Sequence, residues 1–208
     1  MPSLIIFSLI LFVSGCTSLS AFHAPTTNGK GHLQTAIGVT GRNSFVVTSL
    51  DASYGVADQM DIGIKLESGS GLAFVQYQAL SHEGSPLDLS LLLGVGKSAV
   101  TDYQIRVGVI GGRKYQKLEP YIGFLHHNAR LNTEEIENEG SNEIVNRFFD
   151  GIFDALDKSS VNYFSIPIGM RWHMAKHFQT TFEIQQFHAY TFEKAGFVLG
   201  GLQAGLVF

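Results

Sequence analysis

Three histidines are the residues of this sequence best suited to acid–base chemistry. His126 and His127 are adjacent in one segment, and His188 lies near the end of another. A histidine that activates a serine and is itself oriented by a carboxylate is the nucleophilic arrangement of many hydrolases. No serine-containing motif accompanies these histidines, however, and no histidine spacing typical of zinc sites occurs. The sequence therefore predicts no catalytic residue and no metal site.

Phosphate and nucleic-acid chemistry are also disfavoured. Gly108–Gly112 has the pattern Gly-x-x-Gly-Gly, but it lacks the lysine and the helix of a phosphate-binding loop, so close strand packing is the better interpretation. The net charge of −4 and the lack of any block of Lys or Arg argue against a nucleic-acid partner. With 208 residues, of which 45% are hydrophobic and 15% charged, the chain has the size of one domain.

The single cysteine, Cys16, has the setting of a lipid attachment site. An apolar run, too short to span a membrane as a helix, leads into Val13-Ser14-Gly15-Cys16. This resembles the bacterial lipobox, which implies that residues 1–15 are a signal peptide and that the thiol of Cys16 carries a covalent lipid. We expect no other cofactor. Thr17, in place of Asp, implies sorting to the outer membrane.

Residues 16–31 are rich in Ser, Thr, Asn and Gly, a composition that predicts a lipidated tether. After residue 31 the hydrophobic pattern has a period of two. Such a period is typical of β-strands. In the clearest segment, Leu91, Leu93 and Val95 alternate with a set that is small or polar except for Leu92. Ten segments show this pattern: 32–41, 45–56, 59–67, 72–81, 86–97, 102–113, 119–130, 161–174, 177–190 and 196–208.

Segment length and number favour a transmembrane barrel over a soluble sandwich, which would also alternate. Most segments have about the ten residues that a tilted strand needs to cross a bilayer, and an even number is typical of single-chain bacterial barrels. If strand one runs outward, every inner turn is short, and the long connection 132–160 is extracellular, as is usual. The barrel domain then covers 32–208.

The last segment alternates up to a terminal aromatic residue, Phe208. This pattern resembles the C-terminal signal that the barrel-assembly machinery reads. With the lipobox at Cys16, the chain resembles the small outer-membrane β-barrel lipoproteins of Gram-negative bacteria. The resemblance implies an all-β, closed antiparallel up-and-down barrel in the bacterial outer membrane, with its lipid anchor on the periplasmic side. Its expected partners are outer-membrane lipid, the barrel-assembly machinery and the lipoprotein-sorting machinery.

The predicted strand register points a set of polar and charged side chains into the barrel. The two charge signs must pair there, because an unpaired buried charge is costly. Either a salt-bridged network closes the barrel, or the same residues line a narrow path for a small solute. The charged members of the predicted lumen network are Asp51, Asp61, Lys65, Asp88, Arg106, Arg171 and Glu183.

Within the long connection, 142–158 changes to a helical period and predicts an amphipathic helix that packs over the barrel mouth or binds a partner. Phe148, Phe149, Ile152 and Phe153 would form its contact surface. Our leading hypothesis is a non-enzymatic envelope protein with a structural, adhesive or partner-binding role. A narrow channel for small solutes is the second, and a lipid-modifying or proteolytic enzyme is the third.

Overall fold

The computed structural model describes residues 21–42, 45–67, 69–81, 84–98, 101–131, 160–189 and 196–208. The predicted signal peptide, Cys16, and the predicted helix 142–158 with its four contact residues lie outside the described residues. Within these described ranges, no helix is long and apolar enough to cross a membrane.

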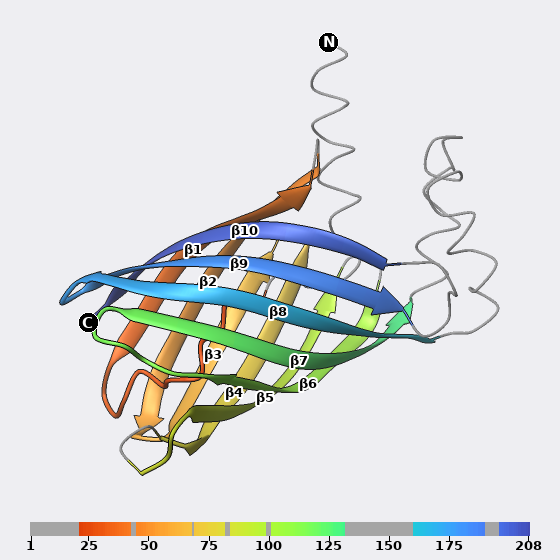
Figure 1. Ribbon diagram of the computed structural model, residues 1–208. Coiled ribbons are helices and arrows are strands. Elements are labelled where there is room, and N and C mark those ends of the chain that lie inside the picture. The colour runs from red at the N-terminus through yellow and green to blue at the C-terminus, as the bar shows by residue number, and fades with distance from the viewer. Residues whose placement is uncertain are drawn as a thin grey trace.

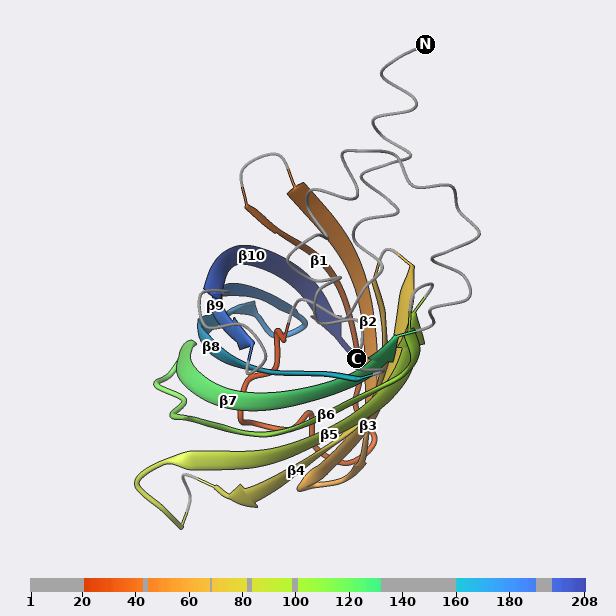
Figure 2. The same cartoon turned by 90° about the vertical axis from the view of Figure 1, so that its right-hand side faces the viewer.

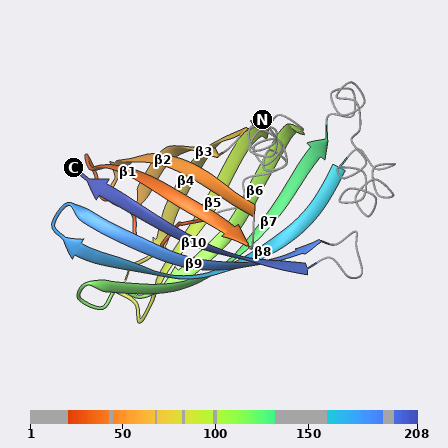
Figure 3. The ribbon, with the colours of Figure 1, turned by 90° about the horizontal axis from the view of Figure 1, so that it is seen from above.

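The described residues form ten strands, as the alternation predicts, and every neighbouring pair is antiparallel (Figure 1). Strand β1 pairs with both β2 and β10, so the sheet closes into a barrel (Figure 3). The strands are β1 (Leu33–Arg42), β2 (Phe45–Ala57), β3 (Met60–Glu67), β4 (Ser70–Leu80), β5 (Asp88–Ser98), β6 (Thr101–Gly112), β7 (Leu118–Leu131), β8 (Ser160–Ala175), β9 (Phe178–Ala189) and β10 (Gly196–Val207).

The even number of strands brings the two ends of the barrel sequence together. The backbone amides of Leu33 and Phe208 each donate to the carbonyl of the other, at 3.1 and 2.8 Å. We call this the terminal end of the barrel; the four hairpin connections after β2, β4, β6 and β8 lie there (Figure 1). The connection between β7 and β8 belongs to the opposite end, which we call the loop end.

The barrel is apolar outside and largely polar inside. Large hydrophobic side chains such as Ile37, Leu93 and Ile184 are 50% or more exposed on the outer face, whereas their sequence neighbours face the lumen. Transmembrane β-barrels have this arrangement, because lipid surrounds the outer face and closure satisfies every strand hydrogen bond. The predicted alternation of faces is therefore present in the folded barrel.

Aromatic side chains gather on the outer face near the terminal end. Exposed there are Tyr54, Tyr77, Tyr115, Trp172 and Phe178. The Arg113 guanidinium carbon lies 5.4 Å from the centre of the Tyr115 ring. Girdles of aromatic residues are typical of the level at which a membrane barrel meets the lipid headgroups. The outer surface thus changes from apolar to amphipathic where the strands end.

Candidate functional site in the barrel lumen

Residues 21–31, which we call the lumen segment, run inside the barrel from Ala21 to its mouth, where Lys30 and Gly31 are exposed (Figure 2). Ala21 and Ala24 have no exposed surface, although neither belongs to a strand. The sequence predicts a solvated tether for 16–31, and for 21–31 the structure differs. The polar residues that resemble a linker form hydrogen bonds with the barrel wall. Residues 16–20 lie outside the described residues.

The deep end of the lumen segment is bound through its backbone. The Glu183 carboxylate accepts hydrogen bonds from the amides of Ala21 and Phe22, at 3.0 and 2.9 Å, and from the Tyr121 hydroxyl at 2.8 Å. The Lys65 ammonium donates to the carbonyl of Ala21 at 3.3 Å. Hydrogen bonds to charged groups are stronger than those between neutral groups. Glu183 is therefore the main anchor of the segment.

Further along, side chains from other strands bind the same segment. Gln76 donates to the carbonyl of Ala24 at 2.7 Å, and the Glu119 carboxylate accepts from both the amide and the hydroxyl of Thr26, at 3.1 and 2.6 Å. Near the terminal end, further bonds join Thr27 to Gln78, Asn28 to Asp61 and Gly31 to Gly55. The bonds to the wall thus follow the segment from one end to the other.

Two glycines let the chain turn from the lumen into β1. Gly29 and Gly31 have φ angles of +80° and +86°, a region that residues with a Cβ rarely adopt. Gly55 on β2 lies so close to the backbone of Gly29 that a Cβ there would overlap it. The Asn-Gly-Lys-Gly sequence before β1 is therefore suited to a tight turn at the barrel mouth.

Phe22 is the large apolar residue of the lumen segment, and its ring lies in a notch formed by two glycines. A Cβ built on Gly38 would lie 2.9 Å from the ring, and one built on Gly201 would lie 2.6 Å from it. The Lys65 ammonium lies 5.2 Å from the ring centre, within cation–π range. The absence of side chains on β1 and β10 at these positions creates the space that the ring fills.

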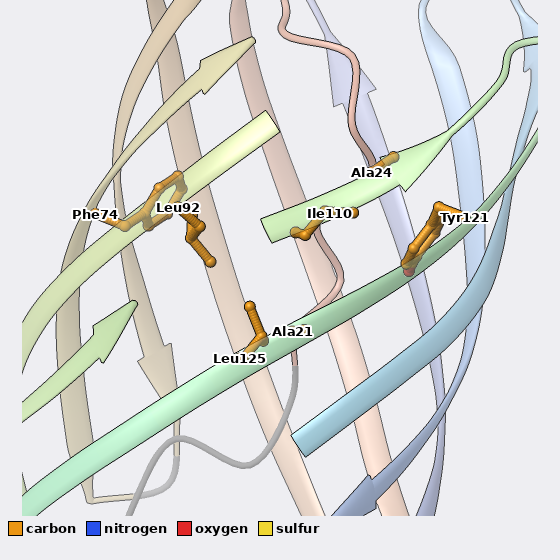
Figure 4. Close-up of a cluster of buried hydrophobic side chains, with 7 residues drawn as sticks. All are labelled: Ala21, Ala24, Phe74, Leu92, Ile110, Tyr121 and Leu125. Carbon is orange, nitrogen blue, oxygen red and sulfur yellow. The ribbon is translucent and has the colours of Figure 1, made fainter. Parts of the chain in front are cut away.

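Small apolar residues of the segment pack on an apolar part of the wall. Figure 4 shows Ala21 and Ala24 among side chains that point inward from β4, β5, β6 and β7. The wall residues of this cluster are Phe74, Leu92, Ile110, Tyr121 and Leu125. A cavity of about 20 Å³ remains beside Phe22, which is room for about one water molecule. The lumen segment thus fills the space at this level of the barrel.

The structure places all seven charged residues of the predicted lumen network inside the barrel, together with others. Lys65 lies 3.8 Å from Asp51 and 3.7 Å from Glu67, and Arg171 lies 3.9 Å from Glu119. Among the described residues, six buried carboxylates face three buried Lys or Arg side chains. The carboxylates are Asp51, Asp61, Glu67, Asp88, Glu119 and Glu183, and the cations are Lys65, Arg106 and Arg171.

Glu119 is a charged lumen residue that the predicted network does not contain. It has no exposed surface, accepts two bonds from Thr26, and lies 3.3 Å from the His173 ring nitrogen. Its position among the inward residues of β7, in alternation with Tyr121, was the available signal. The importance of Glu119 depends on its partner in the lumen segment, which the local pattern does not reveal.

Of the histidines first considered for catalysis, only His127 meets a serine in the lumen. Its Nε2 lies 2.9 Å from the Ser165 hydroxyl, which also accepts a bond from Gln185 at 2.7 Å. The imidazole stacks on Tyr163 with 4.3 Å between ring centres. Ser165 has no exposed surface, and no carboxylate of the described chain hydrogen-bonds His127. These contacts satisfy buried polar groups, but they do not complete a hydrolytic triad.

The other two histidines lie elsewhere. His126 alternates with His127 and belongs to the outer face, and His188 stacks on Phe164 with 4.9 Å between ring centres. In the part of the chain that the structure describes, no cluster of three or more His, Cys, Asp or Glu side chains could hold a metal ion. The lumen, with its bound segment, is therefore the candidate functional site.

The sequence matches no protein-family model, and no curated protein is similar to it. Among solved structures, the N-terminal β-barrel domain of Pseudomonas aeruginosa OprF is 12% identical, with a TM-score of 0.42 over 86% of this chain and 99% of that one. Ail of Yersinia pestis in a phospholipid nanodisc is 10% identical, with a TM-score of 0.39 over 86% and 100%. OprG of P. aeruginosa is 8% identical, with a TM-score of 0.35 over 89% and 99%. At these sequence identities and TM-scores, the similarities carry no argument about the role of this chain.

Proposed function

We propose that this protein is an outer-membrane β-barrel lipoprotein that is closed at rest and has a structural, adhesive or partner-binding role in the bacterial envelope. One observation carries the proposal: the closed barrel is apolar outside, while a segment of its own chain fills the lumen. The outer face supports a position in a bilayer, because such a surface would be unstable in water. The filled lumen argues against an open pore in this state.

The lipid anchor on Cys16 is part of this proposal. Only four residues lie between Cys16 and Ala21, and the five steps from Cys16 to Ala21 span at most about 18 Å. Because Ala21 is the deep end of the lumen segment, beside Glu183, placing the lipid at the terminal end requires the chain before Ala21 to turn back. We propose that it does so and that the lipid enters the periplasmic leaflet, on the side of Phe208.

Labelled palmitate tests the anchor directly. We expect the full-length protein to incorporate the label and to fractionate with the outer membrane, because the thiol of Cys16 accepts the lipid. Cys16→Ser should lose all label, since the sequence contains no other cysteine. Thr17→Ser, which leaves the thiol in place, serves as the matched control. Equal labelling of Cys16→Ser and the wild type would contradict lipidation at this residue.

The proposed contact surface is 142–158 at the loop end. Deleting these residues should abolish adhesion or partner binding while the barrel still folds, because the ten strands lie outside the deletion. Adhesion and envelope permeability of cells with the full-length and the deleted chain are the measurements. Retained heat-modifiable migration in electrophoresis is the control for folding. If the deletion changes no envelope or binding property, the proposed role of the loop is wrong.

A further inference from the structure

We infer that the lumen segment is a displaceable plug and that the lumen behind it is a pore for small cations. This goes beyond the proposed closed barrel, because it assigns the barrel a second, conducting state. The inference rests on three features: how the segment is held, what charge the lumen carries, and which side chains line the rest of the path.

The lumen segment is not a strand of the sheet. Apart from the backbone bond between Gly31 and Gly55, the hydrogen bonds between 21–31 and the wall strands come from single side chains of those strands and form no continuous ladder. Its one large apolar anchor is the ring of Phe22 in the notch of Gly38 and Gly201. Water can replace hydrogen bonds of this kind once the segment moves. The segment can therefore leave without opening the sheet.

The charge of the emptied lumen favours cations. Six buried carboxylates line the described lumen against three Lys or Arg side chains. In the closed state, backbone and hydroxyl donors of the segment occupy Glu183, Glu119 and Asp61. When the segment leaves, Glu183 and Asp61 lose these donors and face water, whereas Glu119 keeps Arg171 and His173 beside it. Rings of Asp and Glu select cations in channels, because they lower the energy of a cation in a narrow path.

Toward the loop end, one side of the lumen is lined mostly by small residues. Inward positions of β4 and β5 there carry Ser70, Gly94, Gly96 and Ser98, together with Leu72, which packs over Gly94. The large buried residues of this region, Tyr163 and Phe187, lie together on β8 and β9. Leu72 is the large inward residue of β4 and β5 in this region, so this side of the path carries less side-chain bulk than the side of Tyr163 and Phe187.

A pair of neighbouring glycines gives a matched test. Gly201→Ala places a methyl group against Phe22 and the Thr40 hydroxyl, whereas a Cβ on Gly200 meets nothing within 4 Å. In planar bilayers with purified full-length protein, we expect the wild type and Gly200→Ala to be almost silent. Overpacking should raise the open fraction of Gly201→Ala by about tenfold or more. In a KCl gradient, its reversal potential should have the sign of cation permeation.

A second variant keeps the test decisive if Gly201→Ala fails to fold. Deleting residues 21–28 removes Phe22 together with the backbone donors that bind Glu183 and the Thr26 hydroxyl that binds Glu119. This variant should conduct cations, and a synthetic peptide of residues 21–31 added from the terminal side should block it. Heat-modifiable migration confirms that each barrel is folded.

Three results would overturn parts of these proposals separately. Folded variants that are both silent contradict the plugged pore and leave the closed barrel intact. Preference for anions contradicts the assignment of cations. A wild type that conducts as strongly as Gly201→Ala contradicts the closed barrel itself.

Discussion

Glu183→Leu should strongly destabilise the barrel and release the lumen segment. The leucine leaves the amides of Ala21 and Phe22 and the hydroxyl of Tyr121 without their acceptor. Each buried group that loses its partner costs about 1–3 kcal/mol, so we expect a loss of about 3 kcal/mol or more. The loss is measured by denaturant unfolding of the lipid-embedded protein. The fluorescence of Trp172, the sole tryptophan, monitors the unfolding.

Glu183→Gln is the matched control for this change. Glutamine keeps one acceptor oxygen and nearly the same volume, so the loss should be clearly smaller than for leucine. Trp172 lies on the outer face of β8, away from the substituted lumen, and its emission reports on the barrel as a whole. If Glu183→Leu unfolds at the wild-type denaturant concentration, Glu183 does not anchor the segment.

Leu93→Lys should have a comparable effect through the outer face. Leu93 lies in the middle of β5 and is 50% exposed. A lysine at the bilayer midplane of a membrane barrel costs about 2–4 kcal/mol, whereas one near the interface costs about 0–1 kcal/mol. We therefore expect a large loss of stability in lipid vesicles, with part of the protein failing to insert. Unfolding in urea and the blue shift of Trp172 on insertion provide the measurement.

Leu33→Lys is the control for depth. Leu33 begins β1 at the terminal end and is also exposed, at 41%, so lysine there can reach the headgroups. A barrel in water would tolerate both substitutions equally. Equal stability of Leu33→Lys and Leu93→Lys would therefore contradict the membrane position of the outer face.

Much of the architecture could be predicted because it depends on local pattern. The period of two places every strand, and the segment lengths and even number favour closure. The same alternation assigns each charged residue of the lumen network to the inner face, because side chains of a strand point alternately to its two sides. Strand ends differ from the prediction by only a few residues, since turns tolerate such shifts.

The lumen segment could not be predicted, because its structure depends on partners that are distant in the sequence. Residues 21–31 have the composition of a linker, and nothing local distinguishes a solvated tether from a bound plug. Ala21 is 162 residues from Glu183, and Thr26 is 93 residues from Glu119. Such pairs exist only after the barrel has closed around the segment.

The pair of His127 and Ser165 arises in the same way, from the register between β7 and β8. By itself, the sequence determined the strands, their two faces and the inside-out character of the barrel, since alternation along each strand is a local property. Only the tertiary structure decided what fills the lumen and which donors meet Glu183 and Glu119. Closure of the sheet sets these contacts, because it brings residues from both ends of the chain within hydrogen-bond distance.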